Sequence, residues 1–283
     1  MPLRYVLQYT IAFLKVKVKE YMILDKIVED KKKEVEIRKK AKTVTAICEE
    51  INLVEKPRCF RSALAKEGPT LIAEIKRHSP SRGSIWEDLK PFELAKRYQI
   101  AGASAISVLA DAKYFHGNLK DIQEAHESVD IPCLCKEFII DEYQIFESRC
   151  YKADTLLLIV RILSDMQLNT FLSLSRELGM EPLVEVHNEN EVEQAINAGA
   201  KIIGINNRDL DTLEVDINTT LRLKKIIPED YIVVSESGIS HPQTIQKFYE
   251  AGIQAFLIGE SILYSRKPEE FIPWLLGKGN DES

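Results

Sequence analysis

Charged side chains stand at the ends of three short apolar segments of the sequence. Glu74 and Lys76 end the first segment, Lys136 ends the second and Glu185 ends the third. Because side chains two residues apart on a strand point to the same face, each charge shares a face with an apolar residue of its own segment. Charges that converge inside a protein are unfavourable unless they are paired or used, so these residues are candidates for general acid–base catalysis.

Short apolar runs alternate with amphipathic helical stretches between residues 71 and 270. The eight runs are Leu71–Ile75, Ala105–Leu109, Pro132–Cys135, Thr155–Ile159, Pro182–Val186, Ile202–Ile205, Ile232–Val234 and Ala255–Ile258. Such continuous runs are typical of parallel strands buried on both faces. Eight units with right-handed crossovers favour an α/β fold of the (β/α)8 TIM-barrel type over an open doubly wound sheet. No G-x-G-x-x-G turn follows the first run, which weakens the dinucleotide-binding alternative.

The predicted domain organisation is an N-terminal helical extension at residues 22–68, the barrel at residues 69–276 and a frayed tail at residues 277–283. Residues 1–21 are a doubtful extension, because the apolar stretch Tyr5–Leu14 is too short to span a bilayer and lysines rather than a cleavage site follow it. We expect translation to begin at Met22, with an extra amphipathic helix as the alternative. The run Lys31–Lys33 is interpreted as a solvated helix face.

Composition excludes several classes of protein. The 283 residues carry 38 Lys+Arg and 44 Asp+Glu, a formal charge of −6 that gives no general reason to expect nucleic acid, and no membrane partner is expected. Five cysteines, an odd number, fit reduced thiols in the cytoplasm, and Cys133 and Cys135 are expected to pack in a strand. The histidines show no H-x-x-H spacing, so no metal is predicted, and His187 is expected to be a loop residue.

Small residues after the seventh and eighth runs predict a phosphate site. Ser237 and Gly238 follow the seventh run, and Gly259 and Glu260 follow the eighth, each just before a helix. Backbone N–H groups at this position of a TIM barrel commonly bind phosphate. The loop after the first run, which contains Ser79, could add a hydroxyl group.

Five segments of the chain resemble the indole-3-glycerol-phosphate synthase family, a TIM barrel of tryptophan biosynthesis. The segments are Ile72–Ser81, Lys136–Ile140, Met180–Val186, Gly204–Leu210 and Ser235–Ile239, and the resemblance extends from Met22 to Trp274. It implies that 1-(2-carboxyphenylamino)-1-deoxyribulose 5-phosphate is closed into a ring, decarboxylated and dehydrated, with no metal or organic cofactor. It also implies that the N-terminal helices cover the C-terminal face of the barrel.

The resemblance implies a role for each matching residue. The catalytic set is Glu74, Lys76, Lys136, Glu185, Asn206 and Ser237. The set that binds substrate and phosphate is Ser79, Phe138, Arg208, Glu236, Gly238, Gly259 and Glu260. Lys136 would be the general acid on the ketone and Glu185 a base or a stabiliser of positive charge. Lys76 would lie near the substrate carboxylate or act as an acid in the dehydration, and the division of labour between the two lysines stays open.

Two positions depart from the family pattern. His78 stands where the family often has lysine or alanine, and the loop Ala110–Asn118 varies from the usual one, so we expect altered affinity or loop kinetics. The alternatives are another phosphate-binding barrel, such as a phosphoribosylanthranilate isomerase, and a catalytically silent barrel that acts as a scaffold. The expected partner is a small phosphorylated substrate, and other tryptophan-pathway enzymes are possible partners.

Overall fold

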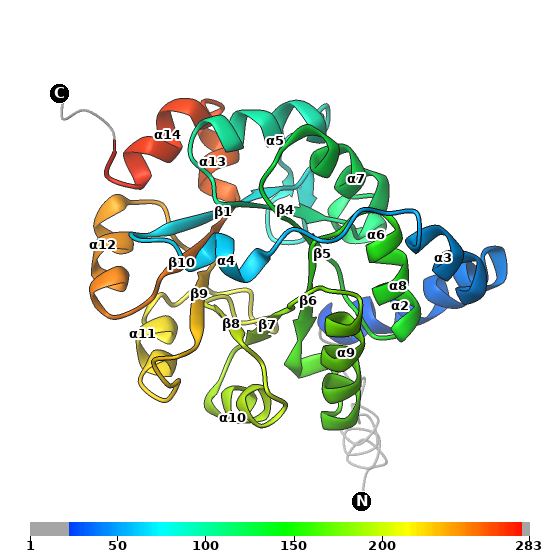
Figure 1. Cartoon of the computed structure of the whole chain (residues 1–283). Helices are drawn as coiled ribbons and strands as arrows, with labels where there is room; N and C mark the ends of the chain where they lie inside the picture. The colour runs from blue at the N-terminus through cyan, green and yellow to red at the C-terminus, as the bar shows by residue number, and fades with distance from the viewer. Residues whose placement is uncertain (1–22, 279–283) are drawn as a thin grey trace, which may run out of the picture.

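The central sheet is a closed barrel of parallel strands. The computed structural model describes residues 23–278, and within them each strand pairs with the next along the chain until β10 closes the ring against β1 (Figure 1). The barrel strands are β1 (Thr70–Ile75), β4 (Ala105–Leu109), β5 (Cys133–Lys136), β6 (Thr155–Ile159), β7 (Leu183–Val186), β8 (Ile202–Asn206), β9 (Ile232–Glu236) and β10 (Ala255–Ile258). The predicted (β/α)8 barrel is confirmed, and the predicted strand ends differ by at most two residues.

Helices surround the barrel; most of them connect successive strands, and the last two follow the final strand (Figure 1). They are α5 (Pro91–Ile100), α6 (Ala112–Phe115), α7 (Leu119–Ser128), α8 (Glu142–Cys150), α9 (Asp165–Glu177), α10 (Glu189–Asn197), α11 (Asn218–Lys224), α12 (Pro242–Glu250), α13 (Glu260–Ser265) and α14 (Pro268–Leu275), with a 3-10 turn η1 (Val160–Ile162). Their starts are encoded locally: Ser164 and Gln167 form a capping box on α9. Glycines with positive φ, Gly199 and Gly252, end α10 and α12.

The barrel interior is apolar at one end and charged at the other. A buried apolar cluster joins Ile72 of β1, Leu134 of β5 and Leu183 of β7. The residues two positions later on these strands are Glu74, Lys136 and Glu185, which therefore point to the same inner face. A parallel barrel brings all strand ends to one rim, so the predicted charges meet at its C-terminal face.

The N-terminal extension occupies both ends of the barrel. It comprises α2 (Ile23–Ala41), α3 (Val44–Ile51) and α4 (Phe60–Leu64). The start of α2 lies at the charged rim, whereas Phe60 and Leu64 of α4 pack on Ile72 in the apolar end of the barrel. Figure 1 shows α4 across the middle of the barrel on the side toward the viewer. Helix α2 therefore covers the C-terminal face of the barrel, whereas α4 closes the opposite end.

A buried lysine attaches α2 to the barrel rim. The Nζ atom of Lys31 lies 2.8 Å from Oδ2 of Asp111, after β4, and 3.0 Å from Oε2 of Glu137, after β5. The side chain of Lys31 is 1% exposed, whereas that of Lys33 is 67% exposed. The interpretation of the lysine run as a solvated face is therefore wrong for Lys31, because only tertiary packing places two carboxylates against that face of the helix.

A short hairpin in the loop after β1 was not predicted. Its strands β2 (His78–Ser79) and β3 (Gly83–Ser84) pair antiparallel. The predictions for residues 1–21 and for residues 279–283 of the tail lie outside the described residues. Among residues 23–278, no helix has both the length and the apolar character needed to cross a membrane.

Candidate active site

A cavity of about 480 Å³ opens at the C-terminal face of the barrel. Every site residue predicted from the sequence lines it, namely Glu74, Lys76, Ser79, Lys136, Phe138, Glu185, Asn206, Arg208, Glu236, Ser237, Gly238, Gly259 and Glu260. They come from six of the eight strand ends and their loops. The strands β4 and β6 contribute only the apolar residues Leu109, Leu157 and Ile159 to the lining. The structure thus brings together residues up to 186 positions apart in the chain, from Glu74 to Glu260.

Lys136 lies between two buried carboxylates at the floor of this cavity. Its Nζ atom is 2.8 Å from Oε2 of Glu236 and 3.2 Å from Oε2 of Glu185. Burial favours the neutral amine, but the charges of Glu236 and Glu185 outweigh burial and hold the pKa of Lys136 well above its ordinary value. Lys136 is therefore an ammonium group that can donate a proton or a hydrogen bond into the cavity.

The two carboxylates beside Lys136 differ in their surroundings. Burial raises the pKa of Glu236 to about 7, although Lys136 opposes this change, and the Oε1 atom of Glu236 has no hydrogen-bond partner among the described residues. Glu185 is equally buried, but Lys136, His187 and Asn206 overcome that burial and hold its pKa well below the ordinary value. Near neutral pH the site thus contains one firmly ionised carboxylate and one that exchanges a proton readily.

Lys76 and Glu74 form a second ion pair on the opposite side of the cavity. The Nζ atom of Lys76 lies 2.8 Å from Oε1 of Glu74, whose side chain is 5% exposed. Gly259, after β10, makes room for this carboxylate, because a Cβ atom there would come within 2.6 Å of Oε1 of Glu74. The glycine that was predicted to bind phosphate therefore also shapes the space around Glu74.

A hydrogen-bond chain joins residues of the two predicted sets, the catalytic one and the one that binds substrate and phosphate. Asn206 donates from Nδ2 to Oε1 of Glu185 at 3.2 Å, and its Oδ1 accepts from the Ser237 hydroxyl at 2.9 Å. The backbone N–H of Arg208 also donates to Oδ1 of Asn206, at 3.0 Å. Three donors and acceptors thus hold the amide in one orientation between the carboxylate and the loop after β9.

The loops after β1, β9 and β10 form the polar mouth of the cavity. Ser237 and Gly238 both have positive φ, at 66° and 79°, so their backbone turns sharply at the rim. The Glu260 carboxylate accepts from Nε of Arg82 at 2.7 Å and lies 3.7 Å from the guanidinium of Arg208. Two guanidinium groups thus stand at the place where a phosphate was predicted, and Arg82 was not among the predicted site residues.

The other wall of the cavity is apolar and includes the N-terminal helix. Phe138, after β5, lies 6.1 Å from Phe115 between ring centroids, and Leu24 and Ile27 from the first turns of α2 complete the wall. An aromatic group can therefore be desolvated next to the charged floor, as the resemblance implies for Phe138.

Three features of the site were missed in the sequence. Gly204 of β8 makes room for Glu236, because a Cβ atom there would come within 2.2 Å of its Oε1 atom. His187 lies in a loop, as predicted, but its Nε2 atom is 3.2 Å from Oε1 of Glu185. The two departures from the family pattern contact each other, since the rings of His78 and His116 stack with centroids 4.4 Å apart. Only the spacing of two between Glu185 and His187 signalled any of these contacts.

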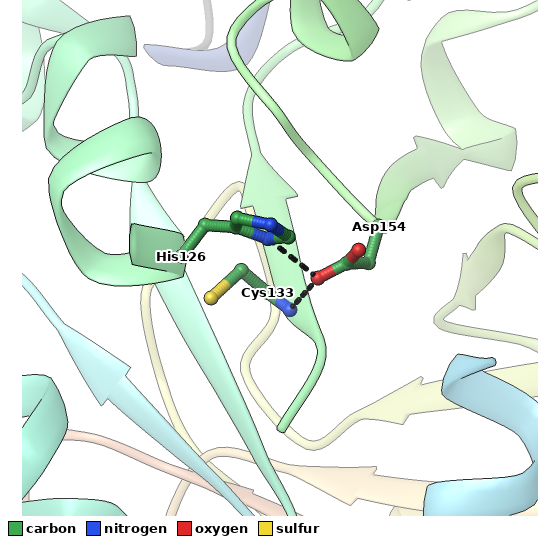
Figure 2. A group of neighbouring side chains, drawn as sticks. All are labelled: His126, Cys133 and Asp154. Carbon is green, nitrogen blue, oxygen red and sulfur yellow. Dashed lines mark hydrogen bonds and ion pairs between the residues drawn. The ribbon is translucent and has the colours of Figure 1, made fainter. Parts of the chain in front are cut away.

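One group of side chains among residues 23–278 has the composition of a metal site, and it lies away from the cavity. Figure 2 shows His126, Cys133 and Asp154, with the thiol turned away from the carboxylate. The Oδ2 atom of Asp154 accepts from the backbone N–H of Cys133 at 2.7 Å and lies 3.1 Å from Nδ1 of His126, while Oδ1 accepts from the backbone N–H of Arg58 at 2.8 Å. These contacts describe a hydrogen-bonded junction between the N-terminal extension and the barrel.

Comparison with known proteins agrees with the geometry. The family model for indole-3-glycerol phosphate synthase matches residues 24–275. The chain is 46% identical to the indole-3-glycerol phosphate synthase of Chloroherpeton thalassium over 248 residues, which are 86% of this chain and 95% of the relative. It is 48% identical to that of Aquifex aeolicus over 220 residues, covering 77% of this chain and 85% of the relative.

A solved structure supports the fold alone. Thiamine phosphate pyrophosphorylase from Pyrococcus furiosus superposes with a TM-score of 0.56 at 12% identity, over 78% of this chain and 97% of that one. The family match covers nearly all of the described residues, including all but the first residue of α2 and the whole barrel. The chain therefore belongs to the indole-3-glycerol phosphate synthase family.

Proposed function

We propose that this protein converts 1-(2-carboxyphenylamino)-1-deoxyribulose 5-phosphate to indole-3-glycerol phosphate, with loss of carbon dioxide and water, in tryptophan biosynthesis. The observation that carries the proposal is the convergence of two ammonium groups, from Lys76 and Lys136, with three carboxylates in one cavity between an apolar wall and a polar mouth. The family relationship supports the same reaction.

Lys136 has the position and charge of the acid for ring closure. An aromatic carbon must attack the substrate ketone, and negative charge then develops on the ketone oxygen. An ammonium group held by Glu185 and Glu236 is oriented before the substrate arrives and can give its proton to that oxygen. Loss of carbon dioxide from the same ring carbon restores aromaticity and needs no further proton donor.

The dehydration that follows needs a second acid and a base. A hydroxyl group must leave with a proton from Lys76 or Lys136, while the adjacent methylene carbon, which is bonded to the nitrogen, loses a proton as the new carbon–carbon double bond forms and the nitrogen keeps its hydrogen. Glu185 is the firmly ionised carboxylate of the site and is suited to accept that proton or to stabilise the positive charge. Glu74 and Asn206 position the groups beside them.

The two ends of the cavity match the two ends of the substrate. The aromatic ring would lie against Phe138 and the first turns of α2, where water is excluded. The phosphate would lie at the polar mouth, on backbone N–H groups of Gly238, Gly259 and Glu260 and on the hydroxyls of Ser79 and Ser237. Arg82 and Arg208 would add positive charge there.

The test is to mix purified protein with this substrate and to follow indole fluorescence, once with EDTA and once without. We expect the signal to rise equally in both samples. No signal from folded protein that still binds the substrate would indicate a silent barrel. A signal that EDTA removes would contradict the prediction that the reaction needs no metal.

We also propose that the enzyme works in the cytoplasm and associates with other enzymes of tryptophan biosynthesis. All five cysteines are free thiols, which supports a reducing compartment. Cell fractionation tests the location, and sedimentation of the purified protein mixed with the neighbouring pathway enzymes tests the association. A sedimentation coefficient that stays unchanged in every mixture would argue against it.

A further inference from the structure

A histidine outside the cavity lies between two carboxylates, one of which belongs to the proposed active site. The Nε2 atom of His187 is 3.2 Å from Oε1 of Glu185, and its Nδ1 atom is 2.9 Å from Oε2 of Glu191. The histidine side chain is 6% exposed and the two carboxylates are 3% and 9% exposed. Glu185 lines the cavity, and His187 can therefore reach the substrate only through Glu185.

The start of helix α10 holds this histidine in place. Asn188 caps the helix by accepting from the backbone N–H of Glu191 at 3.0 Å, and it donates from Nδ2 to Oε1 of Glu191 at 2.7 Å. The other oxygen of Glu191, Oε2, accepts from the backbone N–H of His187 at 2.8 Å. Glu191 thus has a fixed orientation before it meets the imidazole ring, and it supplies a counter-charge for that ring.

The contacts at both ring nitrogens determine the charge of His187. A neutral imidazole has a single N–H group, so the other nitrogen would turn its lone pair toward a carboxylate. An imidazolium carries an N–H group on both nitrogens, so it can form an ion pair with Glu185 at 3.2 Å through Nε2 and a hydrogen bond with Glu191 at 2.9 Å through Nδ1. Burial alone would lower the pKa of His187, but the contacts with the carboxylates of Glu185 and Glu191 raise it to about 9.

Several neighbouring strands and helices place charged side chains around Glu185 and His187. Glu185 faces Lys136 from β5 and Glu236 from β9, with Glu74 from β1 farther away, and it accepts from the neutral Asn206 of β8. On the side of η1 and α10, Arg161 pairs with Asp211 and Arg222 pairs with Glu189. Besides Lys136, His187 is the cation in direct contact with Glu185 among the described residues.

We infer that His187, held by Glu191, is a positioning residue for Glu185: it fixes the carboxylate toward the cavity and keeps it anionic at the working pH. The inference rests on the proposed function for the role of Glu185, but the charge of His187 can be measured without catalysis. Glu191, in turn, acts as the counter-ion that keeps the histidine charged.

The first experiment is an NMR titration of the full chain with ¹⁵N-labelled histidine. The His187 signals are assigned from their loss in His187→Gln. We expect both ring nitrogens to stay protonated at pH 7.5, and we expect Glu185→Gln and Glu191→Gln each to lower the midpoint by about one unit or more. A neutral His187 at pH 7, or a midpoint that neither variant moves, would overturn the inference whether or not the protein is active.

The second experiment is the pH profile of kcat/KM for His187→Gln. Glutamine can still donate to Glu185 but carries no charge, so protonation of Glu185 becomes easier and the acidic limb moves to higher pH. We expect the acidic limb to move by about one unit, while kcat/KM at pH 8.5 changes less than twofold. The matched control is His241→Gln, at an exposed histidine before α12, which should leave the profile unchanged.

Glu191→Gln provides an independent variant that leaves the imidazole ring in place. It should move the acidic limb in the same direction as His187→Gln, because the histidine loses its counter-ion. Circular dichroism checks that both variants are natively folded. If they are, and the acidic limb of each coincides with that of the wild type, the positioning role of His187 is contradicted. Should His187→Gln fail to fold, Glu191→Gln and the NMR titration of the unmodified chain decide the matter alone.

Discussion

The absence of a side chain at Gly204 makes room for the carboxylate of Glu236 on the neighbouring strand. A Cβ atom at Gly204 would lie 2.2 Å from Oε1 of Glu236 and 3.2 Å from a methyl group of Leu183. The same carboxylate holds Lys136 through its other oxygen, at 2.8 Å. A residue that does no chemistry thus sets the position of the proposed general acid.

Gly204→Ala should lower kcat through displacement of Glu236. A carboxylate moved by about 1 Å no longer orients Lys136, and we expect a loss of about 10- to 100-fold. Ser107→Ala is the control, because Ser107 is equally buried in a barrel strand and its hydroxyl has no hydrogen-bond partner among the described residues. In the double variant Gly204→Ala/Glu236→Asp the two losses should not multiply, since the shorter side chain no longer meets the added methyl group. If the loss in kcat of the double variant equals the product of the two single losses, the two residues act independently.

Lys136→Ala should abolish most of the turnover. Removal of the proposed general acid is expected to lower kcat by about 10³-fold or more, measured by indole fluorescence. Circular dichroism should show a native fold, since Glu236 can take up a proton when its cation is lost. Lys247→Ala, at an exposed lysine of α12, is the matched control and should retain full activity. Near-normal turnover of Lys136→Ala would remove this residue from the mechanism.

Glu236→Gln should stabilise the protein increasingly as pH rises. The pKa of Glu236 is about 7 in the folded protein and has an ordinary value of 4.5, so the contribution of Glu236 to folding is present at low pH and is lost as pH rises through about 7. Glutamine removes this dependence. Relative to the wild type, we expect the free energy of unfolding of the variant to increase by on the order of 2 kcal/mol between pH 5 and pH 8. Urea titrations at several pH values measure this, and parallel curves for both proteins would show that Glu236 does not titrate in this range.

Lys31→Met should destabilise the protein strongly. It leaves Asp111 buried without its cation and Glu137 with only Arg38, at 3.6 Å, for which we expect a loss of about 3–5 kcal/mol in the free energy of unfolding by urea. Lys33→Met provides the control two residues away, because the exposed Lys33–Glu29 pair contributes less than about 1 kcal/mol. Equal effects of the two substitutions would show that Lys31 does not anchor α2.

Removal of residues 1–21 should leave kcat and KM unchanged. The family match begins at residue 24, and the apolar wall of the cavity uses residues from Ile23 onward. A matched deletion of residues 1–31 also removes the first turns of α2 and the Lys31 anchor, and we expect it to raise KM sharply. Loss of activity on removal of residues 1–21 alone would assign a function to this segment.

The local sequence pattern determined most of the architecture. Eight apolar runs with glycines between helix and strand specify a parallel barrel, because strands buried on both faces leave a continuous apolar signal. Alternation along each strand then placed Glu74, Lys136 and Glu185 on the inner face. Since all parallel strands end at one rim, the convergence of these residues followed from the topology alone. The same topology positions the loops after β9 and β10 that are predicted to bind phosphate.

Tertiary structure alone decided which residues contact one another across the barrel. The pairs Lys136–Glu236, Lys31–Glu137 and Gly204–Glu236 depend on strand register and on where α2 packs. A lysine on a helix gives the same local pattern whether water or a carboxylate faces it, so the burial of Lys31 could not be seen in the sequence. The placement of α4 at the opposite end of the barrel could not be seen in the sequence either, because Phe60 and Leu64 contact their apolar partners only in the closed barrel.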